Sequence, residues 1–259
     1  MTGRPIEHVA QRTGIQAEAP HVHAGLWGCG ANGSETRVVL LPGLGTDARL
    51  FGAQREVLGD CPVVPRWIEP AGDDESVRAV ARRMAEGRRR RCGAGPVVRG
   101  GASFGGMLAL EMARELRPAA VVLIGSARSG GAVSRAYRRF ARLLQWTPTW
   151  GVRAATVVLS KLASSVDVID GRSQRVYEAM LWDASPRLVR WAARAIPRWR
   201  LRGPVGVPVR HLHGGCDAVL PLAKVTPDVV LPGAGHLPSL THPREVNRFL
   251  RRCVAAAGG

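Results

Sequence analysis

A serine flanked by glycines is the side chain of this sequence best suited to nucleophilic chemistry. Ser103 stands at the centre of residues 101–105 (GASFG), between a short apolar run and a helical pattern over residues 107–116. A strand, a sharp turn and a helix present such a hydroxyl outward, and the turn needs glycine on both sides so that strand and helix can pass closely. Because G-x-S-x-G also arises by chance, the interpretation depends on the partners of Ser103.

An aspartate and a histidine follow two later predicted strands. Asp217 comes after the strand that ends in residues 211–214 (HLHG), and His236 ends residues 232–236 (PGAGH). In an open parallel sheet, residues just beyond the carboxyl ends of the strands meet at the ligand-binding edge. An imidazole that takes the serine proton, itself oriented by a carboxylate, makes serine a nucleophile. We therefore predict that Ser103 is the nucleophile, His236 the general base and Asp217 the orienting acid.

The elements that must position these residues alternate between strands and helices. We expect strands at residues 38–41, 63–68, 97–100, 119–124, 205–212 and 229–231, and helices at residues 47–58, 76–91, 106–117 and 243–256. Strands alternating with helices of about 10 to 15 residues indicate right-handed crossovers and a mostly parallel sheet covered on both faces. The predicted fold class is therefore α/β.

The middle of the chain breaks this alternation. Residues 126–203 carry helical patterns only, at about 133–144, 149–162, 174–181 and 186–196. This segment is predicted to be a helical insertion over one end of the sheet. The α/β core then comprises residues 37–125 and 204–259, and residues 1–36 form an N-terminal segment with a candidate edge strand at residues 21–27.

Four segments together resemble the α/β-hydrolase superfamily. They are residues 40–45 (LLPGLG), 101–106 (GASFGG), 213–221 (HGGCDAVLP) and 233–236 (GAGH), and the order Ser, Asp, His is the order of that arrangement. The resemblance covers about residues 36–256. It implies an α/β-hydrolase fold, a mostly parallel central sheet flanked by helices, in which the helical insertion is a lid over the pocket, and a reaction without a cofactor.

Two backbone N–H groups are expected to form an oxyanion hole. The attacked carbonyl develops negative charge, which aligned donors stabilise. Phe104 follows the nucleophile and should supply one donor, and Leu44 should supply the other. Many relatives have His-Gly before that second donor, whereas this chain has Pro42 and Gly43. That histidine is not a triad member, so its absence is expected to alter the support of the loop more than the chemistry.

A serine nucleophile points to acyl chemistry. Relatives that open epoxides or displace halide use aspartate at this place. We expect hydrolysis of a carboxylic ester through an acyl-enzyme; the alternatives are a C–C bond hydrolase, an acyltransferase, or a member that binds a ligand without turnover. Because five of seven tryptophans fall in the insertion, Trp146, Trp150 and Trp182 are candidate substrate-binding residues for an apolar acyl or aromatic group. The alternative is that tryptophans pack the insertion onto the core.

Charge gives weaker guidance than the motifs. The formal net charge is +17, and every basic residue except Lys161 and Lys224 is arginine. Such a preference for arginine over lysine is typical of a bias in the base composition of the genome. Because the sequence has no helix-turn-helix, zinc-finger or RNA-recognition pattern, we expect no specific nucleic-acid partner. The arginines of residues 135–142 either attract a carboxylated substrate or form a solvated face. The expected partner is a small ester or acyl compound, and the oligomeric state stays open.

Cysteine, histidine and hydropathy patterns bound the remaining classes. Five cysteines without a C-x-x-C pair argue against a disulfide framework. His211 and His213 form an H-x-H pattern, but because no third ligand is evident we expect no metal. Residues 1–20 lack the apolar core of a signal peptide, and no uncharged apolar stretch of about 18 residues occurs. We therefore expect a cytoplasmic protein without a membrane span.

Overall fold

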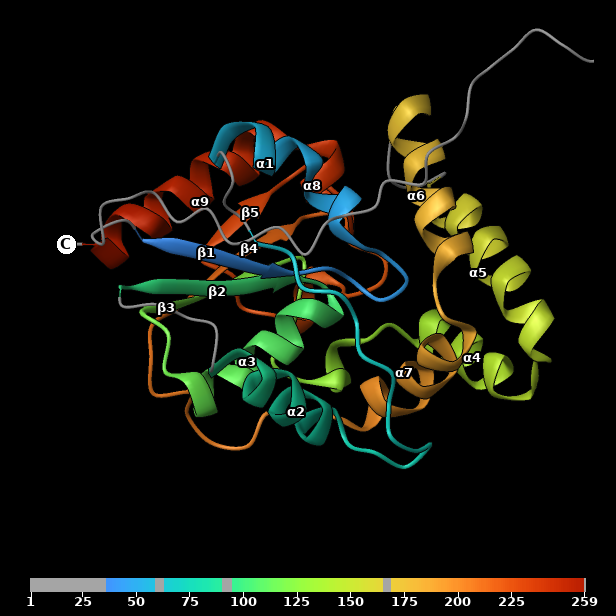
Figure 1. The fold of residues 1–259 in the computed structure, drawn as a ribbon. Helices are drawn as coiled ribbons and strands as arrows, with labels where there is room; N and C mark the ends of the chain where they lie inside the picture. The colour runs from blue at the N-terminus through green and yellow to red at the C-terminus, as the bar shows by residue number, and fades with distance from the viewer. Residues whose placement is uncertain (1–35, 59–62, 90–94, 165–168, 259) are drawn as a thin grey trace, which may run out of the picture.

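One parallel sheet forms the centre of the protein. The computed structural model describes residues 36–58, 63–89, 95–164 and 169–258. Within this part the sheet has the order β1-β2-β3-β4-β5, with all neighbours parallel. The strands are β1 (Arg37–Leu41), β2 (Val97–Ala102), β3 (Ala120–Ile124), β4 (Val209–Gly214) and β5 (Val229–Leu231). The predicted α/β fold class is confirmed (Figure 1).

Helices cover both faces of the sheet because the strands are apolar on both sides. Successive strand side chains point to opposite faces, and an all-apolar strand such as β3 must be covered twice. Val121 and Leu123 belong to the cluster shared with α2 (Val77–Arg89) and α3 (Phe104–Leu116). Val122 and Ile124 belong to the opposite cluster, which includes residues of α9 (Pro243–Gly258). Figure 1 shows α2 and α3 on one face, with α9, α1 (Gly52–Leu58) and α8 (Pro238–Thr241) on the other.

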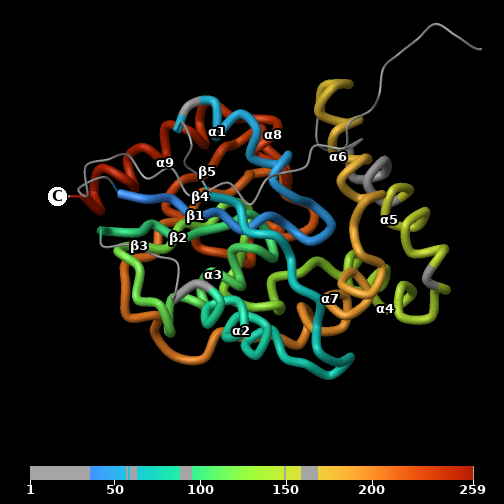
Figure 2. Tube along the Cα trace, viewed as in Figure 1, coloured from blue at the N-terminus to red at the C-terminus, as the bar shows by residue number. Residues whose placement is uncertain are grey.

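The insertion between β3 and β4 is helical, as expected. Its four α-helices in the described residues are α4 (Arg135–Trp146), α5 (Thr149–Ser164), α6 (Gly171–Asp183) and α7 (Pro186–Arg198). They stand beyond the carboxyl ends of β1 and β2 (Figures 1 and 2). Two buried tryptophans bind the end of the insertion to the core: the Nε1–H of Trp191 donates to the carbonyl of Glu75 at 2.7 Å, and that of Trp199 to Oε1 of Glu111 at 2.8 Å.

Prolines explain where the expected strands are wrong. The strand expected at residues 63–68 is reduced to a single bridge between Val63 and Val39, because Pro65 has no N–H for a sheet ladder. Likewise, the strand expected from residue 205 begins at Val209, directly after Pro208. The candidate strand at residues 21–27 lies outside the described residues. In the described part of the chain, no helix combines the length and the apolar character needed to span a bilayer.

Candidate active site

Ser103 occupies a strained turn between β2 and α3. Its φ of 49° and ψ of −120° lie in a region that residues with a side chain seldom adopt. Its N–H donates to the carbonyl of Ile124 at 3.0 Å, which holds the turn against β3. A Cβ on Gly101 would come within 2.5 Å of the carbonyl carbon of Gly105, and a Cβ on Gly105 would collide with the carbonyl of Leu41. The two glycines therefore permit the close approach that presents the serine hydroxyl.

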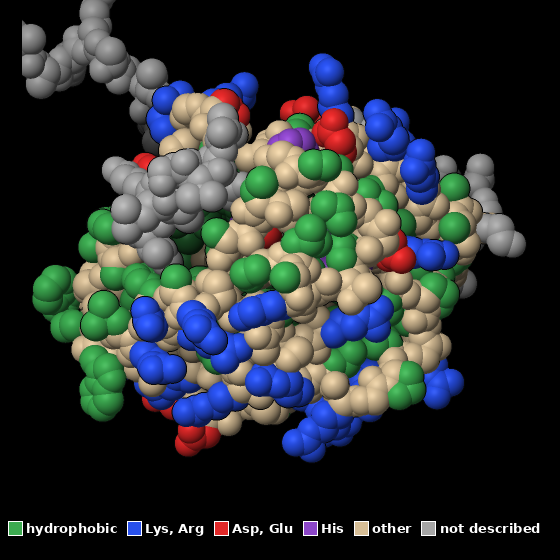
Figure 3. Space-filling view, turned by 180° about the vertical axis from the view of Figure 1, so that it is seen from behind, with side chains coloured by type: hydrophobic (Ala, Val, Ile, Leu, Met, Phe, Trp, Pro, Cys, Tyr) green, Lys and Arg blue, Asp and Glu red, His purple; other side chains and the backbone are tan. Residues whose placement is uncertain are grey.

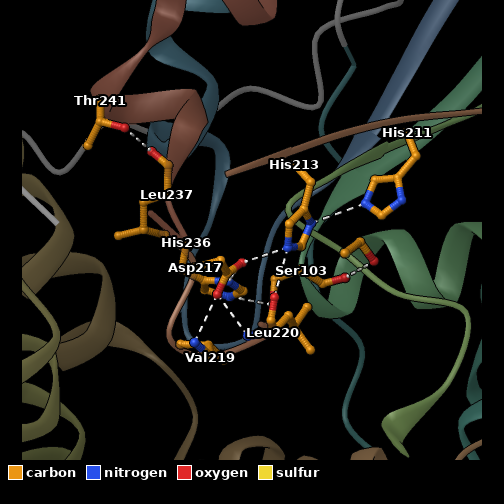
Figure 4. A network of polar contacts seen from close by, with 10 residues as sticks. Ser103, His211, His213, Asp217, Val219, Leu220, His236, Leu237 and Thr241 are labelled. Atoms are coloured by element: carbon orange, nitrogen blue, oxygen red, sulfur yellow. Dashed lines mark hydrogen bonds and ion pairs between the residues drawn. The ribbon is translucent and has the colours of Figure 1, made fainter. Parts of the chain in front are cut away.

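Ser103, His236 and Asp217 form a continuous chain of hydrogen bonds (Figure 4). The distance from Ser103 Oγ to His236 Nε2 is 2.9 Å, and that from His236 Nδ1 to Asp217 Oδ2 is 2.7 Å. The structure thus brings together three side chains that the sequence separates by up to 133 positions. This geometry allows His236 to accept the serine proton while the carboxylate stabilises the resulting imidazolium.

The carboxylate of Asp217 is buried but well supplied with donors. Its Oδ1 accepts the N–H groups of Val219 at 2.8 Å and Leu220 at 2.7 Å. Burial acts to raise the pKa of Asp217, but the charge and hydrogen bond of His236 and the Leu220 N–H together hold it below its usual value. Asp217 is therefore ionised at neutral pH.

Two buried histidines lie behind Asp217 and support it. His213 Nε2 lies 2.8 Å from the carbonyl oxygen of Leu220 and 3.4 Å from Asp217 Oδ2. A carbonyl oxygen only accepts, so Nε2 of His213 carries the proton, and its Nδ1 accepts from Nε2–H of His211 at 3.2 Å. The H-x-H spacing of this pair suggests only metal ligation, so it leaves the contact with Asp217 unpredicted. The position of His213 at the end of a strand, four residues before Asp217, is the signal that could have indicated its contact with the acid.

Protonation of His211 is expected to destabilise the fold in mild acid. Burial lowers the pKa of His211 from 6.5 to about 4. Between pH 6.5 and pH 4, His211 is protonated in the unfolded chain but stays neutral in the folded chain. The contribution of His211 to the free energy of unfolding is therefore complete above pH 6.5 and is lost as the pH falls toward 4. The free energy of unfolding should drop by about 2 kcal/mol between pH 7.5 and pH 5 from this group alone.

Urea denaturation at the two pH values measures that drop. In His211→Gln the difference between pH 7.5 and pH 5 should shrink by about 2 kcal/mol relative to the wild type. An equal pH dependence of the free energy of unfolding in the two proteins would contradict the assignment of this drop to His211.

An apolar cavity of about 310 Å³ adjoins the triad. Ser103 and His236 lie in its wall, and the insertion supplies Tyr137, Phe140 and Leu144 from α4 and further side chains from α6 and α7. Among the described residues that line it, none is Asp, Glu, Lys or Arg. Burying a charged group here would therefore cost its hydration without a countercharge.

The two residues predicted for the oxyanion hole also lie in the cavity wall. Within the described residues, neither the N–H of Leu44 nor that of Phe104 has a hydrogen-bond acceptor. The loop that carries Leu44 is closed by Thr46, whose N–H and hydroxyl both donate to the carbonyl of Gly43. Trp67 in turn donates to the Thr46 carbonyl at 2.9 Å. These contacts support a loop that has Pro42 where many relatives have histidine.

The sequence matches the profile of the Alpha/beta hydrolase family over residues 38–249. The chain belongs to this family. No curated protein sequence matches it significantly.

Solved structures share the fold of this α/β hydrolase at low sequence identity. A thermophilic esterase from Thermogutta terrifontis is 22% identical, with 88% of this chain and 92% of the other covered and a TM-score of 0.69. MenH from S. aureus is 14% identical, with coverages of 89% and 97% and a TM-score of 0.65. The enol-lactonase from Burkholderia xenovorans LB400 is 15% identical, with coverages of 84% and 90% and a TM-score of 0.66. At these identities the likeness establishes the fold alone.

The tryptophans expected to bind substrate do not reach the cavity of this hydrolase. Trp146, Trp150 and Trp182 are 86%, 82% and 56% exposed, and none lines the cavity wall. The expectation is corrected for a geometric reason: Trp146 follows the cavity-lining Tyr137 by nine positions, which places it on the opposite side of α4. The aromatic side chains that line the cavity are instead those of Phe104, Tyr137, Phe140 and Tyr177.

Proposed function

We propose that this α/β hydrolase is a carboxylesterase that cleaves neutral, apolar esters through an acyl-enzyme on Ser103. The observation that carries the proposal is the unbroken hydrogen-bond chain from Ser103 through His236 to Asp217, at the wall of a cavity whose described lining residues include no Asp, Glu, Lys or Arg. A nucleophile, a base and an orienting acid in this geometry are the requirements of acyl transfer to serine.

The chemistry proceeds in two halves. Ser103 Oγ attacks the ester carbonyl as His236 Nε2 takes its proton, and the N–H groups of Leu44 and Phe104 stabilise the oxyanion. His236 then gives the proton to the departing alkoxide, which leaves an acyl group on Ser103. A water molecule, deprotonated by His236, attacks that ester and releases the acid, and the proton returns to Ser103. His213 acts as a positioning residue in both halves, because it ties the Leu220 carbonyl and Asp217 to the end of β4.

The helical insertion is proposed to act as the lid that selects the substrate. Its α4, α6 and α7 contribute Tyr137, Tyr177 and Ile196 to the wall of the cavity that also contains Ser103. A cavity of about 310 Å³ is at the small end of known ligand sites, which favours a short or medium acyl chain.

A fluorophosphonate probe tests the function directly, because it reacts with an activated serine whatever the natural acyl group is. We expect the wild type to be labelled, with the adduct on the peptide that contains Ser103, and Ser103→Ala to stay unlabelled. A folded wild type that resists the probe would contradict the esterase and favour a ligand-binding protein without turnover.

The lining of the cavity predicts discrimination against charged acyl groups. The value of kcat/KM for p-nitrophenyl succinate, with its free carboxylate, should be about 100-fold or more below that for p-nitrophenyl butyrate, because burying the unpaired charge costs several kcal/mol. Methyl p-nitrophenyl succinate is the matched control: it has a similar shape without the charge and should recover most of the activity. Comparable rates for the charged and neutral esters would contradict the proposed substrate class.

Thioesters and β-diketones belong in the same assay, since acyltransferases and C–C bond hydrolases use the same triad. Faster turnover of a β-diketone than of any ester would replace the carboxylesterase assignment by C–C bond cleavage.

A further inference from the structure

Two helices of the insertion meet at a corner that exposes large apolar side chains. Trp146 at the end of α4 and Trp150 near the start of α5 stand on either side of residues 147–149, and both are strongly exposed. Leu143, one helical turn before Trp146 on α4, is 65% exposed. The three residues Leu143, Trp146 and Trp150 are named the α4–α5 tip. Figure 3 shows hydrophobic side chains projecting from the edge of the molecule that the insertion forms.

The apolar residues of the tip are not needed for packing the insertion onto the core. The inner side of α4 already carries Tyr137, Phe140 and Leu144, which line the cavity. Leu143 and Trp146 share another side of the helix, where a surface helix normally has polar residues. Contiguous apolar side chains on a surface mark an interaction site, because water contact is unfavourable for them.

Arginine side chains border the tip on both α4 and α5. Arg139 and Arg142 precede Leu143 and Trp146 by four positions each, so they share a side of α4 with them, and Arg153 follows Trp150 by three positions on α5. All three arginines are exposed. Residues 127–166 contain no Asp or Glu. In Figure 3 a band of Lys and Arg side chains lies next to the projecting hydrophobic ones.

This combination fits an anionic lipid surface. Tryptophan favours the boundary between lipid and water, where its ring is buried and its N–H stays solvated. Basic residues close to an anionic bilayer contribute about 1 kcal/mol each. A second copy of the chain is a poorer fit, since it would bring its own arginines against those of the first in a protein of net charge +17.

We propose that the α4–α5 tip docks the protein onto anionic lipid bilayers, with Trp146 and Trp150 at headgroup level and Arg139, Arg142 and Arg153 against the lipid phosphates. The docking itself does not depend on esterase activity. If the proposed function holds, docking also places the roof of the cavity beside the phase in which a neutral, apolar ester dissolves.

Vesicle sedimentation with the full-length protein tests the docking. The probes are vesicles of phosphatidylcholine containing about one-third phosphatidylglycerol and vesicles of phosphatidylcholine alone, at about 50 mM and about 500 mM salt. The wild type should bind the anionic vesicles at low salt and release them at high salt. Trp146→Ser/Trp150→Ser should weaken the partition coefficient about tenfold or more, and Arg139→Gln/Arg142→Gln by a similar factor.

The charge-matched control lies away from the insertion, on the helix α9 that covers one face of the sheet (Figure 1). Arg251→Gln/Arg252→Gln on α9 removes the same charge from exposed positions and should change binding less than about twofold. All substituted side chains are exposed, so circular dichroism should be unchanged in each variant.

Three results would overturn the proposal. In the first, the wild type does not bind anionic vesicles at low salt. In the second, Trp146→Ser/Trp150→Ser binds them as well as the wild type does. In the third, sedimentation velocity shows a dimer for the wild type and a monomer for this variant, which would make the tip a self-association surface. Ser103→Ala should bind vesicles normally. Loss of esterase activity with vesicle binding intact therefore bears on the proposed function alone.

Discussion

Replacing Ser103 with alanine is expected to lower kcat for p-nitrophenyl butyrate by about 10⁴-fold or more. The replacement removes only the hydroxyl, whose oxygen lies 2.9 Å from His236 Nε2 in the wild type. Without this oxygen, His236 has no nucleophile to activate. The residual rate should come from the oxyanion donors and from substrate binding, which survive the change. Initial rates measured under saturating substrate, with active protein quantified by absorbance, check the value.

The strained turn should tolerate this replacement, because Ser103→Ala keeps the Cβ and the Ser103 N–H bond to Ile124. Ser173→Ala is the remote control: it removes a hydroxyl from the surface of α6, bonded there to Asp170, and should retain activity within about twofold. A Ser103→Ala protein that keeps more than about one hundredth of the wild-type kcat would refute the assignment of the nucleophile.

Replacing Asp217 with asparagine is expected to lower kcat by about 10⁴-fold while leaving the fold in place. The oxygen at the Oδ1 position accepts two backbone N–H groups, from Val219 and Leu220, so the amide oxygen of asparagine must take that position. The NH₂ group then faces His236 Nδ1, where it can only donate. The imidazole proton is driven to Nε2, which can no longer accept the proton of Ser103.

Asp228→Asn is the matched control for this change. Asp228 also bonds near the histidine pair, since its Oδ2 accepts the backbone N–H of His211 at 2.6 Å. Its replacement should cost about tenfold in kcat or less. Steady-state kinetics of both variants on p-nitrophenyl butyrate decide the matter: equal losses would show that the acid is not specifically Asp217.

Local sequence patterns predicted those parts of the fold that depend on apolar runs and turn residues close together in the chain. The helical stretch of the insertion and the parallel sheet follow from such patterns. The glycines at positions 101 and 105 mark the turn in the sequence, but the close contact that requires Gly105 is with the carbonyl of Leu41, far away in the chain. The strand expected at residues 63–68 shows the limit of this reasoning. Its apolar content favoured a strand, but a proline that cannot donate to a ladder decided against it.

The residue types of the candidate site, and their order along the chain, could be predicted from the sequence. Ser103, Asp217 and His236 each follow a strand, and parallel strands deliver such positions to one edge of a sheet. The distances of 2.9 Å and 2.7 Å depend on strand register and loop conformation, which the motifs do not encode. Donation to Asp217 from Val219 and Leu220 likewise requires the folded turn.

By itself, then, the sequence determined the α/β alternation, the order of the three candidate catalytic side chains and the helical character of the insertion. Only the tertiary structure decided that Trp146 faces solvent while Tyr137 lines the cavity, and that His213 contacts Asp217. The physical reason is that periodicity fixes which residues share a side of a helix, whereas α4 has apolar side chains on more than one side. Contacts with segments distant in sequence decide which apolar side of α4 faces the cavity and which faces solvent.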